Sequence, residues 1–127
     1  MTIQASAPGK LILIGEYAVL FGAPAVVMAV DRRALVTLDP SPSAEWSVAA
    51  PGLTDAIGRF RFGHEGSPRW VDPSHGADEF QLVDRLLNGL AADERKALAN
   101  RSTVAMTLDT RSFFATLAGS RRKLGLG

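Results

Sequence analysis

Two charged residues flank the most apolar stretch near the N-terminus, and both are of types that take part in group transfer. Lys10 precedes and Glu16 closely follows the four apolar residues 11–14. Charges at the edge of a core need a partner or a ligand, because an unpaired charge is unfavourable in an apolar setting. Gly9 and Gly15 would let the backbone approach that ligand closely. The pattern indicates a polar site, although a hairpin with two solvated ends explains it more simply.

The C-terminal residues have the glycine spacing of an anion-binding loop. Residues 123–127 read KLGLG, and backbone N–H groups in such a segment can surround a phosphate when a helix follows. A frayed terminal segment is the simpler explanation of so short a pattern. The loop is not a Walker A motif, because no Gly-x-x-x-x-Gly-Lys-Ser/Thr sequence occurs in the chain.

Together the two segments resemble one family of small-molecule kinases. Residues 7–26 read APGKLILIGEYAVLFGAPAV, which resembles the first conserved segment of the GHMP kinases, the family of galactokinase, homoserine kinase, mevalonate kinase and phosphomevalonate kinase. Residues 123–127 resemble the start of that family's second segment, a Gly-Leu-Gly-Ser-Ser-Ala phosphate loop, in matching order and placement. GEYAV at 15–19 and DTRSFF at 109–114 are most similar to phosphomevalonate kinases, whereas mevalonate kinases more often have His in place of Tyr17.

The resemblance implies transfer of the ATP γ-phosphoryl group to phosphomevalonate in the mevalonate route to isoprenoids, with ATP and Mg²⁺ as cofactors of the parent enzyme. Lys10 would be catalytic, because its charge would offset the negative charge that the two substrates share during transfer. Glu16 and Tyr17 would line the pocket of the small-molecule acceptor. The ATP phosphates would lie beside three residues of the C-terminal segment: Lys123, Gly125 and Gly127.

The same resemblance implies that residues 1–127 are the N-terminal part of a GHMP kinase N-terminal domain, of the ribosomal protein S5 domain 2-like type, ending inside the phosphate-binding loop. The family's metal-binding residues would lie downstream, so we assign no metal ligand within the chain. We therefore expect the 127-residue chain alone to be inactive and to expose apolar surface that favours self-association. Mevalonate kinase is the nearest alternative, and a non-catalytic binding or assembly module is the alternative of another class.

The hydrophobic pattern predicts an α+β fold in which most strands precede the helices. Four residues spaced three and four apart predict one apolar helix stripe: Phe80, Val83, Leu87 and Leu90. A shorter helix is expected at 93–99, and residues 63–76 read as an irregular segment. Strands are expected at 3–7 and 11–14 around a tight turn at Pro8 and Gly9, then at 26–30, 34–38, 46–49, 60–62 and 103–109.

Composition limits the remaining possibilities. With 127 residues, 46% hydrophobic and 21% charged, the chain reads as one soluble globular domain without a domain boundary. A net charge of +1 without a basic stripe gives no reason to expect nucleic acid or an anionic membrane as partner. The absence of cysteine, of a long apolar stretch and of a secretory signal favours the cytoplasm.

Other chemically interesting side chains receive a structural interpretation. His64 and His75 have no second ligand at the spacing of a zinc site, so we expect loop histidines. Four aromatic residues on predicted strands or in loops are interpreted as core rather than as a stacking platform: Trp46, Phe60, Phe62 and Trp70. Arg121 and Arg122 either approach a phosphate-rich substrate or form a basic terminus.

Overall fold

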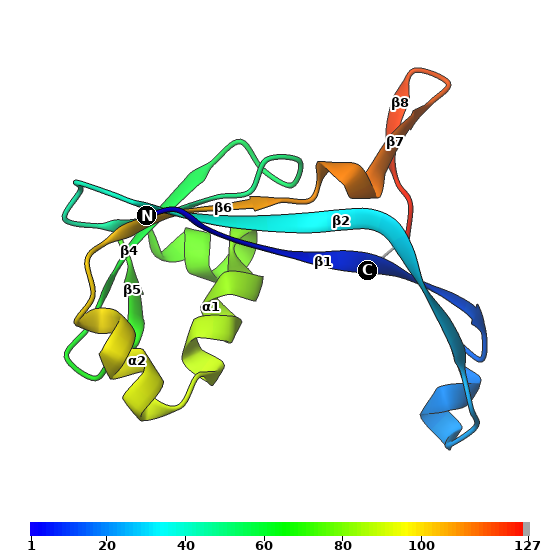
Figure 1. Cartoon of the computed structure of the whole chain (residues 1–127), viewed down its shortest axis with the longest axis horizontal. Helices are drawn as coiled ribbons and strands as arrows, with labels where there is room; N and C mark the ends of the chain where they lie inside the picture. The colour runs from blue at the N-terminus through cyan, green and yellow to red at the C-terminus, as the bar shows by residue number, and fades with distance from the viewer. Residues whose placement is uncertain (126–127) are drawn as a thin grey trace.

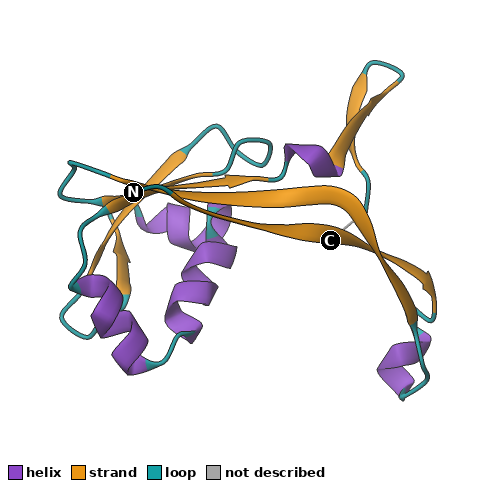
Figure 2. Ribbon diagram, viewed as in Figure 1, coloured by secondary structure: helices purple, strands orange, loops and turns teal. Residues whose placement is uncertain are grey.

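A six-stranded sheet with two helices on one side forms most of the molecule, as the computed structural model shows (Figures 1 and 2). The structure describes residues 1–125, apart from the side chain of residue 77. The spatial strand order is β1-β2-β6-β3-β4-β5, and only the β3–β6 pair is parallel. The predicted α+β fold is confirmed.

The elements have the following bounds. The sheet contains β1 (Ile3–Ile14), β2 (Val26–Pro40), β3 (Trp46–Ala49), β4 (Ile57–Phe62), β5 (Pro68–Trp70) and β6 (Val104–Asp109). The α-helices are α1 (Gln81–Gly89) and α2 (Ala92–Ala99), and three short helical turns are η1 (Ala18–Phe21), η2 (His75–Glu79) and η3 (Arg111–Phe113). A separate hairpin consists of β7 (Phe114–Leu117) and β8 (Ser120–Lys123).

The core lies between the centre of the sheet and α1. Alternation along β3 and β4 directs every second side chain toward the helix, so that Val48 and Phe60 are fully buried. The predicted apolar stripe faces them with Val83 and Leu87 of α1 and with Phe80, the residue before α1, all buried. Aromatic packing completes the cluster: Trp46 and Phe62 meet edge to face with ring centroids 5.1 Å apart, and Trp70 stacks on Phe80 at 5.8 Å. The predicted aromatic core is confirmed.

β1 and β2 form one long antiparallel pair rather than four short strands around a turn. The register changes where Pro8 pairs with Arg33 and Gly9 pairs with Val30, which leaves two residues of β2, 31 and 32, as a bulge. The predicted turn at Pro8 and Gly9 is therefore wrong. β1 is an edge strand, where a proline without an N–H group is tolerated, and the bulge absorbs the irregularity without ending the pairing.

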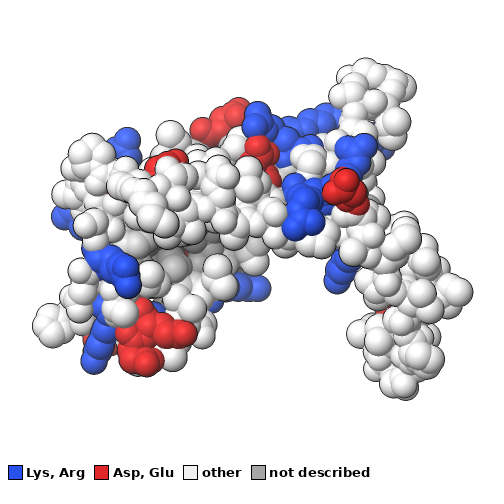
Figure 3. Space-filling model, viewed as in Figure 1, with Lys and Arg blue, Asp and Glu red and all other residues white. Residues whose placement is uncertain are grey.

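Beyond this bulge, residues 10–30 leave the body of the molecule as an arm with η1 at its tip (Figure 1). The arm exposes these large apolar residues: Leu11, Leu13, Ile14, Tyr17, Val19, Leu20, Phe21, Val26, Val27 and Met28. Figure 3 shows it almost free of charged side chains on the visible face. Within residues 1–125, no helix is long and apolar enough to cross a membrane.

Two further segments differ from expectation. Residues 63–76 are not wholly irregular, because β5 pairs with β4 there and η2 begins at His75. The β7–β8 hairpin was not predicted. Ala118 and Gly119 form its turn, because both have positive φ, as in a two-residue hairpin turn, and they lie between residues that pair across it. The hairpin matters because it determines where the C-terminal segment lies.

Candidate functional site

One open cavity brings together residues from the two ends of the chain. It has a volume of about 320 Å³ and is lined by Lys10, Leu11, Ile12, Glu16 and Gly125. A volume of this order is at the lower end of the range for small-molecule sites. A cation, an anion and the backbone of a glycine therefore share one hollow, as a site for a charged small molecule requires.

Lys10 and Glu16 reach this cavity from the arm. Lys10 is the first residue of β1 beyond buried Gly9 and pairs with Ala29 of β2, while Glu16 lies two residues past the end of β1. Both are exposed, and neither takes part in an ion pair within residues 1–125. Their charges are thus available to a ligand in the cavity rather than to each other or to a neighbour.

Gly15 shapes the turn that carries Glu16, but it does so against the protein's own backbone. Its φ is +90°, and a Cβ atom there would lie 2.7 Å from the carbonyl oxygen of Pro24 and 2.9 Å from Cα of Ala25. The close approach expected at this glycine is therefore made by the returning chain of the arm. Tyr17 follows as the residue before η1; it is 76% exposed and does not line the cavity.

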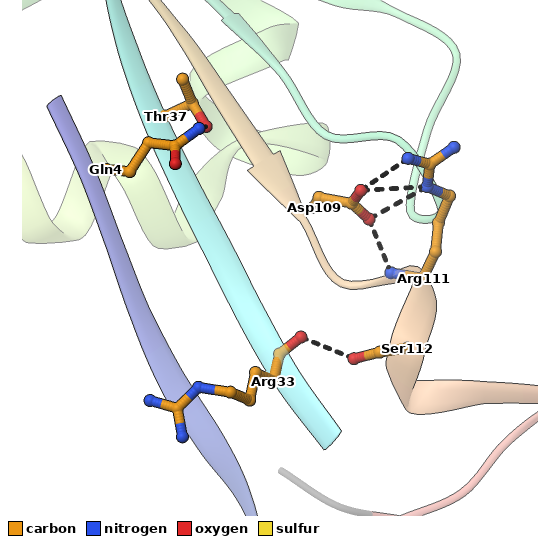
Figure 4. Close-up of polar contacts among 6 residues, drawn as sticks. All are labelled: Gln4, Arg33, Thr37, Asp109, Arg111 and Ser112. Carbon is orange, nitrogen blue, oxygen red and sulfur yellow. Dashed lines mark hydrogen bonds and ion pairs between the residues drawn. The ribbon is translucent and has the colours of Figure 1, made fainter. Parts of the chain in front are cut away.

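Gly125 is brought to the cavity by η3 and the C-terminal hairpin, which are tied to the β2 bulge. The hydroxyl of Ser112 donates to the carbonyl oxygen of Arg33 at 2.6 Å, as Figure 4 shows. In return, Nη1 of Arg32 donates to the carbonyl oxygen of Ser112 at 3.1 Å. After the hairpin, the N–H of Leu124 donates to the carbonyl oxygen of Phe113 at 2.9 Å. The bulge next to Lys10 and the segment next to Gly125 are thus held to the same short turn.

An ion pair fixes the start of that turn. Nη2 of Arg111 lies 2.6 Å from Oδ2 of Asp109, and the backbone N–H of Arg111 donates to Oδ1 at 2.9 Å (Figure 4). Hydrogen bonds from the Arg111 guanidinium and backbone lower the pKa of the Asp109 carboxyl. The same pairing raises the pKa of Arg111. The carboxylate therefore holds the guanidinium in place wherever both are charged.

The remaining expected site residues are not in this cavity. Lys123 lies on β8 opposite Phe114 and lines a different hollow, a largely apolar one of about 290 Å³ beside Leu82 and Leu108. Gly127 lies outside the described residues. Sequence reasoning also overlooked Ser112 and the bulge residue Arg32, because nothing in their local pattern shows that a turn and a strand far apart in the chain meet.

No metal centre is found in the part of the chain that the structure describes. Within it, no group of three or more His, Cys, Asp or Glu side chains could hold a metal ion. His64 is exposed. His75 is the first residue of η2, and its Nε2 lies 3.3 Å from Oε2 of Glu79 and 4.0 Å from Oδ2 of Asp72.

Comparison with known proteins shows what the chain is similar to. No family model matches the chain. The chain is 32% identical over 130 residues to a phosphomevalonate kinase of a Streptomyces species, covering 99% of this chain and 34% of that protein. The resemblance to the GHMP kinases is confirmed: the chain is related to mevalonate and phosphomevalonate kinases, both members of that family.

Particular relatives agree with this class. A mevalonate kinase of Methanothermobacter thermautotrophicus is 38% identical over 80 residues, covering 54% of this chain and 26% of that protein. One from Arabidopsis thaliana is 54% identical over 46 residues, 35% of this chain and 12% of that protein. The chain thus spans about a third or less of the length of these relatives.

A solved structure matches the whole fold. The crystal structure of a Lin0012 protein from Listeria innocua superposes on the entire chain with a TM-score of 0.67 at 27% identity, using 32% of that protein's chain. The arrangement of sheet, helices and arm is therefore that of one part of a larger protein of known structure.

Proposed function

We propose that the cavity of Lys10, Glu16 and Gly125 is part of an ATP-dependent phosphoryl-transfer site whose acceptor is phosphomevalonate. The observation that carries this proposal is the meeting of the two ends of the chain in one hollow. The similarity to a phosphomevalonate kinase over 99% of the chain supports the choice of acceptor. A cation on a strand and a glycine backbone facing one cavity are well suited to two substrates that both carry phosphate.

The proposed reaction forms one P–O bond and breaks another. An oxygen of the acceptor's phosphate attacks the γ-phosphorus of ATP, the bond from the γ-phosphorus to the bridging oxygen breaks, and ADP leaves with that oxygen. The ammonium group of Lys10 offsets the negative charge that accumulates between donor and acceptor, so its role is electrostatic. Bound Mg²⁺ would supply further charge compensation on the ATP phosphates.

The other site residues receive roles by position. The Glu16 carboxylate accepts hydrogen bonds from acceptor hydroxyl groups. Tyr17 lies outside the cavity, and only the family resemblance would assign it to the acceptor. The backbone N–H group of Gly125 approaches the ATP phosphates. The family resemblance would assign the same ligand to Lys123, which lies outside this cavity, and to Gly127, which lies outside the described residues. A cytoplasmic location and a place at the start of a GHMP kinase N-terminal domain remain parts of this proposal.

Mevalonate is the second candidate acceptor, favoured by the mevalonate kinases among the relatives. The two acceptors differ in chemistry, because the mevalonate hydroxyl must lose a proton on phosphorylation whereas an ionised phosphate oxygen need not. A general base is thus required for mevalonate alone. Acceptor preference therefore decides between the two proposals.

The test uses the product expressed from the natural gene, supplied with Mg-ATP and either acceptor. We expect ADP formation with phosphomevalonate and about 10²-fold or greater loss of turnover in Lys10→Met, because removal of a group that stabilises transition-state charge has effects of this order. Lys96→Met is the matched control, since Lys96 is an exposed lysine on α2. Turnover with mevalonate but not with phosphomevalonate would identify mevalonate as the acceptor. Full activity of Lys10→Met would refute the role of this lysine.

The 127-residue chain by itself is expected to show no turnover, since it corresponds to 34% of its phosphomevalonate kinase relative. An assay of this chain, verified by intact mass, measures that directly. Steady ADP formation dependent on an acceptor would contradict the expectation and would favour a complete site within these residues. Absence of turnover in the natural gene product as well would favour the non-catalytic binding module.

A further inference from the structure

A second polar cavity lies between the η3 turn and the C-terminal hairpin. Its volume is about 230 Å³, and its lining residues are Arg111, Phe114, Ala115, Thr116 and Arg121. It shares none of these residues with the cavity of Lys10 and Glu16. The two cavities are therefore separate sites.

Two arginine side chains that line this cavity come close to Gly52. A Cβ atom at Gly52 would lie 2.8 Å from Cγ of Arg111 and 2.8 Å from Nη2 of Arg121, and the φ of Gly52 is +100°. Both features favour glycine here, because a side chain would displace the arginines and strain the backbone. The β3–β4 loop thus lies close to the Arg111 and Arg121 side chains.

Each arginine is also held by a second contact. Oxygens of Asp109 accept hydrogen bonds from Nε and Nη2 of Arg111, which leaves its Nη1 without a partner among residues 1–125. Cζ of Arg121 lies 4.2 Å from the ring centroid of Phe114, a cation–π contact that orients the guanidinium without neutralising it. Two guanidinium donors beside one cavity are therefore available for one ligand.

The charge balance of the cavity is positive. Asp109 compensates Arg111, whereas Arg121 has no carboxylate partner within the described residues. Thr116, opposite Arg121 across the hairpin, adds a hydroxyl group to the lining. Figure 3 shows Lys and Arg side chains gathered about the base of this hairpin. Arginine forks match the geometry of phosphate oxygens, so an anion of this type fits the cavity.

We propose that the cavity of Arg111, Thr116 and Arg121 binds a phosphate or diphosphate group of a small molecule, at a site separate from that of Lys10. Arg121 supplies the uncompensated charge and Nη1 of Arg111 the second donor, with Asp109 keeping Arg111 in position. The group can belong to inorganic pyrophosphate or to a nucleotide. Binding is expected to weaken as salt is raised, because the site is open to solvent.

The experiment titrates inorganic pyrophosphate into the chain and follows binding by calorimetry and by amide NMR shifts of residues 111–121. We expect Arg121→Gln to weaken binding about tenfold or more, since charge-assisted hydrogen bonds are the strong ones. Arg122→Gln is the matched control: it removes the same charge one residue away, but Arg122 pairs with Ala115 and does not line the cavity. Arg122→Gln should change affinity by less than about twofold, given screening of exposed charges.

Equal weakening by Arg121→Gln and Arg122→Gln would overturn the proposal, because it would show attraction to net charge alone. An absence of pyrophosphate binding by the unmodified chain would overturn it as well. If Arg121→Gln disturbs the hairpin in the NMR spectrum, Arg121→Lys replaces it. That variant keeps the charge but loses the fork, and weaker binding by it supports the site whereas unchanged binding refutes it. ATP is titrated in parallel: shifts shared with pyrophosphate at 111–121 identify the nucleotide as a source of the phosphate group.

Discussion

The body of the molecule and its arm both contain large apolar side chains, but the body buries them and the arm exposes them. In the body, Phe60 is 0% exposed and lies among aromatic and aliphatic neighbours that fix the sheet against α1. In the arm, Phe21 is 89% exposed and Ile14 is 71% exposed. The body therefore provides the stability of the fold, while the arm contributes little burial and carries Lys10 and Glu16.

The proposed site lies on the less buried of the two regions, so the positions of Lys10 and Glu16 depend on how the arm is attached to the body. A two-stranded ribbon is marginally stable by itself, so the arm depends on its continuation into the sheet and on the hydrogen bonds of the bulge to Ser112. Active sites are often drawn from such less stable regions. The exposed apolar surface of the arm is of the kind that marks an interaction site.

The largest expected effect separates the two regions with one type of substitution. Phe60→Ala should lower the free energy of unfolding by about 3–5 kcal/mol, because it removes a buried ring and leaves a cavity. Phe21→Ala should change it by less than about 0.5 kcal/mol, as for other exposed positions. Urea denaturation of both variants measures this contrast. Similar losses in both would show that the tip of the arm is packed in solution.

The second effect concerns association. We expect the chain to self-associate through the arm, and Leu20→Ser with Phe21→Ser should raise the dissociation constant about tenfold or more, since each buried side chain of this size contributes about 1.5–3 kcal/mol. Sedimentation velocity over a range of concentrations measures it. Leu82→Ser on α1, also strongly exposed, is the control for general loss of apolar surface. A monomeric unmodified chain would contradict the expectation.

A smaller effect is expected where the turn is tied to the bulge. Ser112→Ala removes the bond to the Arg33 carbonyl and should destabilise the fold by about 1 kcal/mol, the usual contribution of one hydrogen bond. It should also increase hydrogen exchange at the Leu124 amide, which bonds to η3. Ser102→Ala, at an exposed serine, should change neither. Unaltered exchange at Leu124 in Ser112→Ala would show that the hairpin is positioned by other contacts.

The smallest effect is a dependence on pH. Because the folded pKa of Asp109 lies below its unfolded value, the pair with Arg111 contributes stability above the ordinary carboxyl pKa of about 4, and this is lost as pH falls through the folded pKa. Asp109→Asn should therefore narrow the difference in melting temperature between pH 7 and pH 3. An identical pH profile for the two proteins would mean that the exposed pair contributes nothing measurable.

Local patterns predicted the body well and the long-range features poorly. The stripe of α1 and the strands β3 and β6 follow from residue spacing, since neighbours in sequence decide which face is apolar. The bulge at Pro8 could not be predicted, because it depends on how β1 and β2 align across a gap in sequence. Proline and glycine read locally as a turn, and only the partner strand makes them an irregularity within a continuous pair.

The candidate site was predictable only in part. Charge placement pointed to Lys10 and Glu16, and the family resemblance pointed to the C-terminal glycines, but no local signal joined the two. Their meeting depends on the hairpin and on Ser112, which sequence reasoning did not single out. Tyr17 and Lys123 lie outside the cavity because the turn before η1 and the strand β8 direct them elsewhere.

The most direct test of the account asks whether both ends of the chain bind one ligand. Mg-ATP and then phosphomevalonate are titrated into the ¹⁵N-labelled chain, and amide shifts are followed at residues 10–12, 16 and 124–125. For each ligand, we expect all of these amides to shift together and to give the same dissociation constant. Lys10→Met should weaken binding at all of them, whereas Lys96→Met should not. Shifts confined to one end of the chain, or two unrelated dissociation constants, would contradict a shared site.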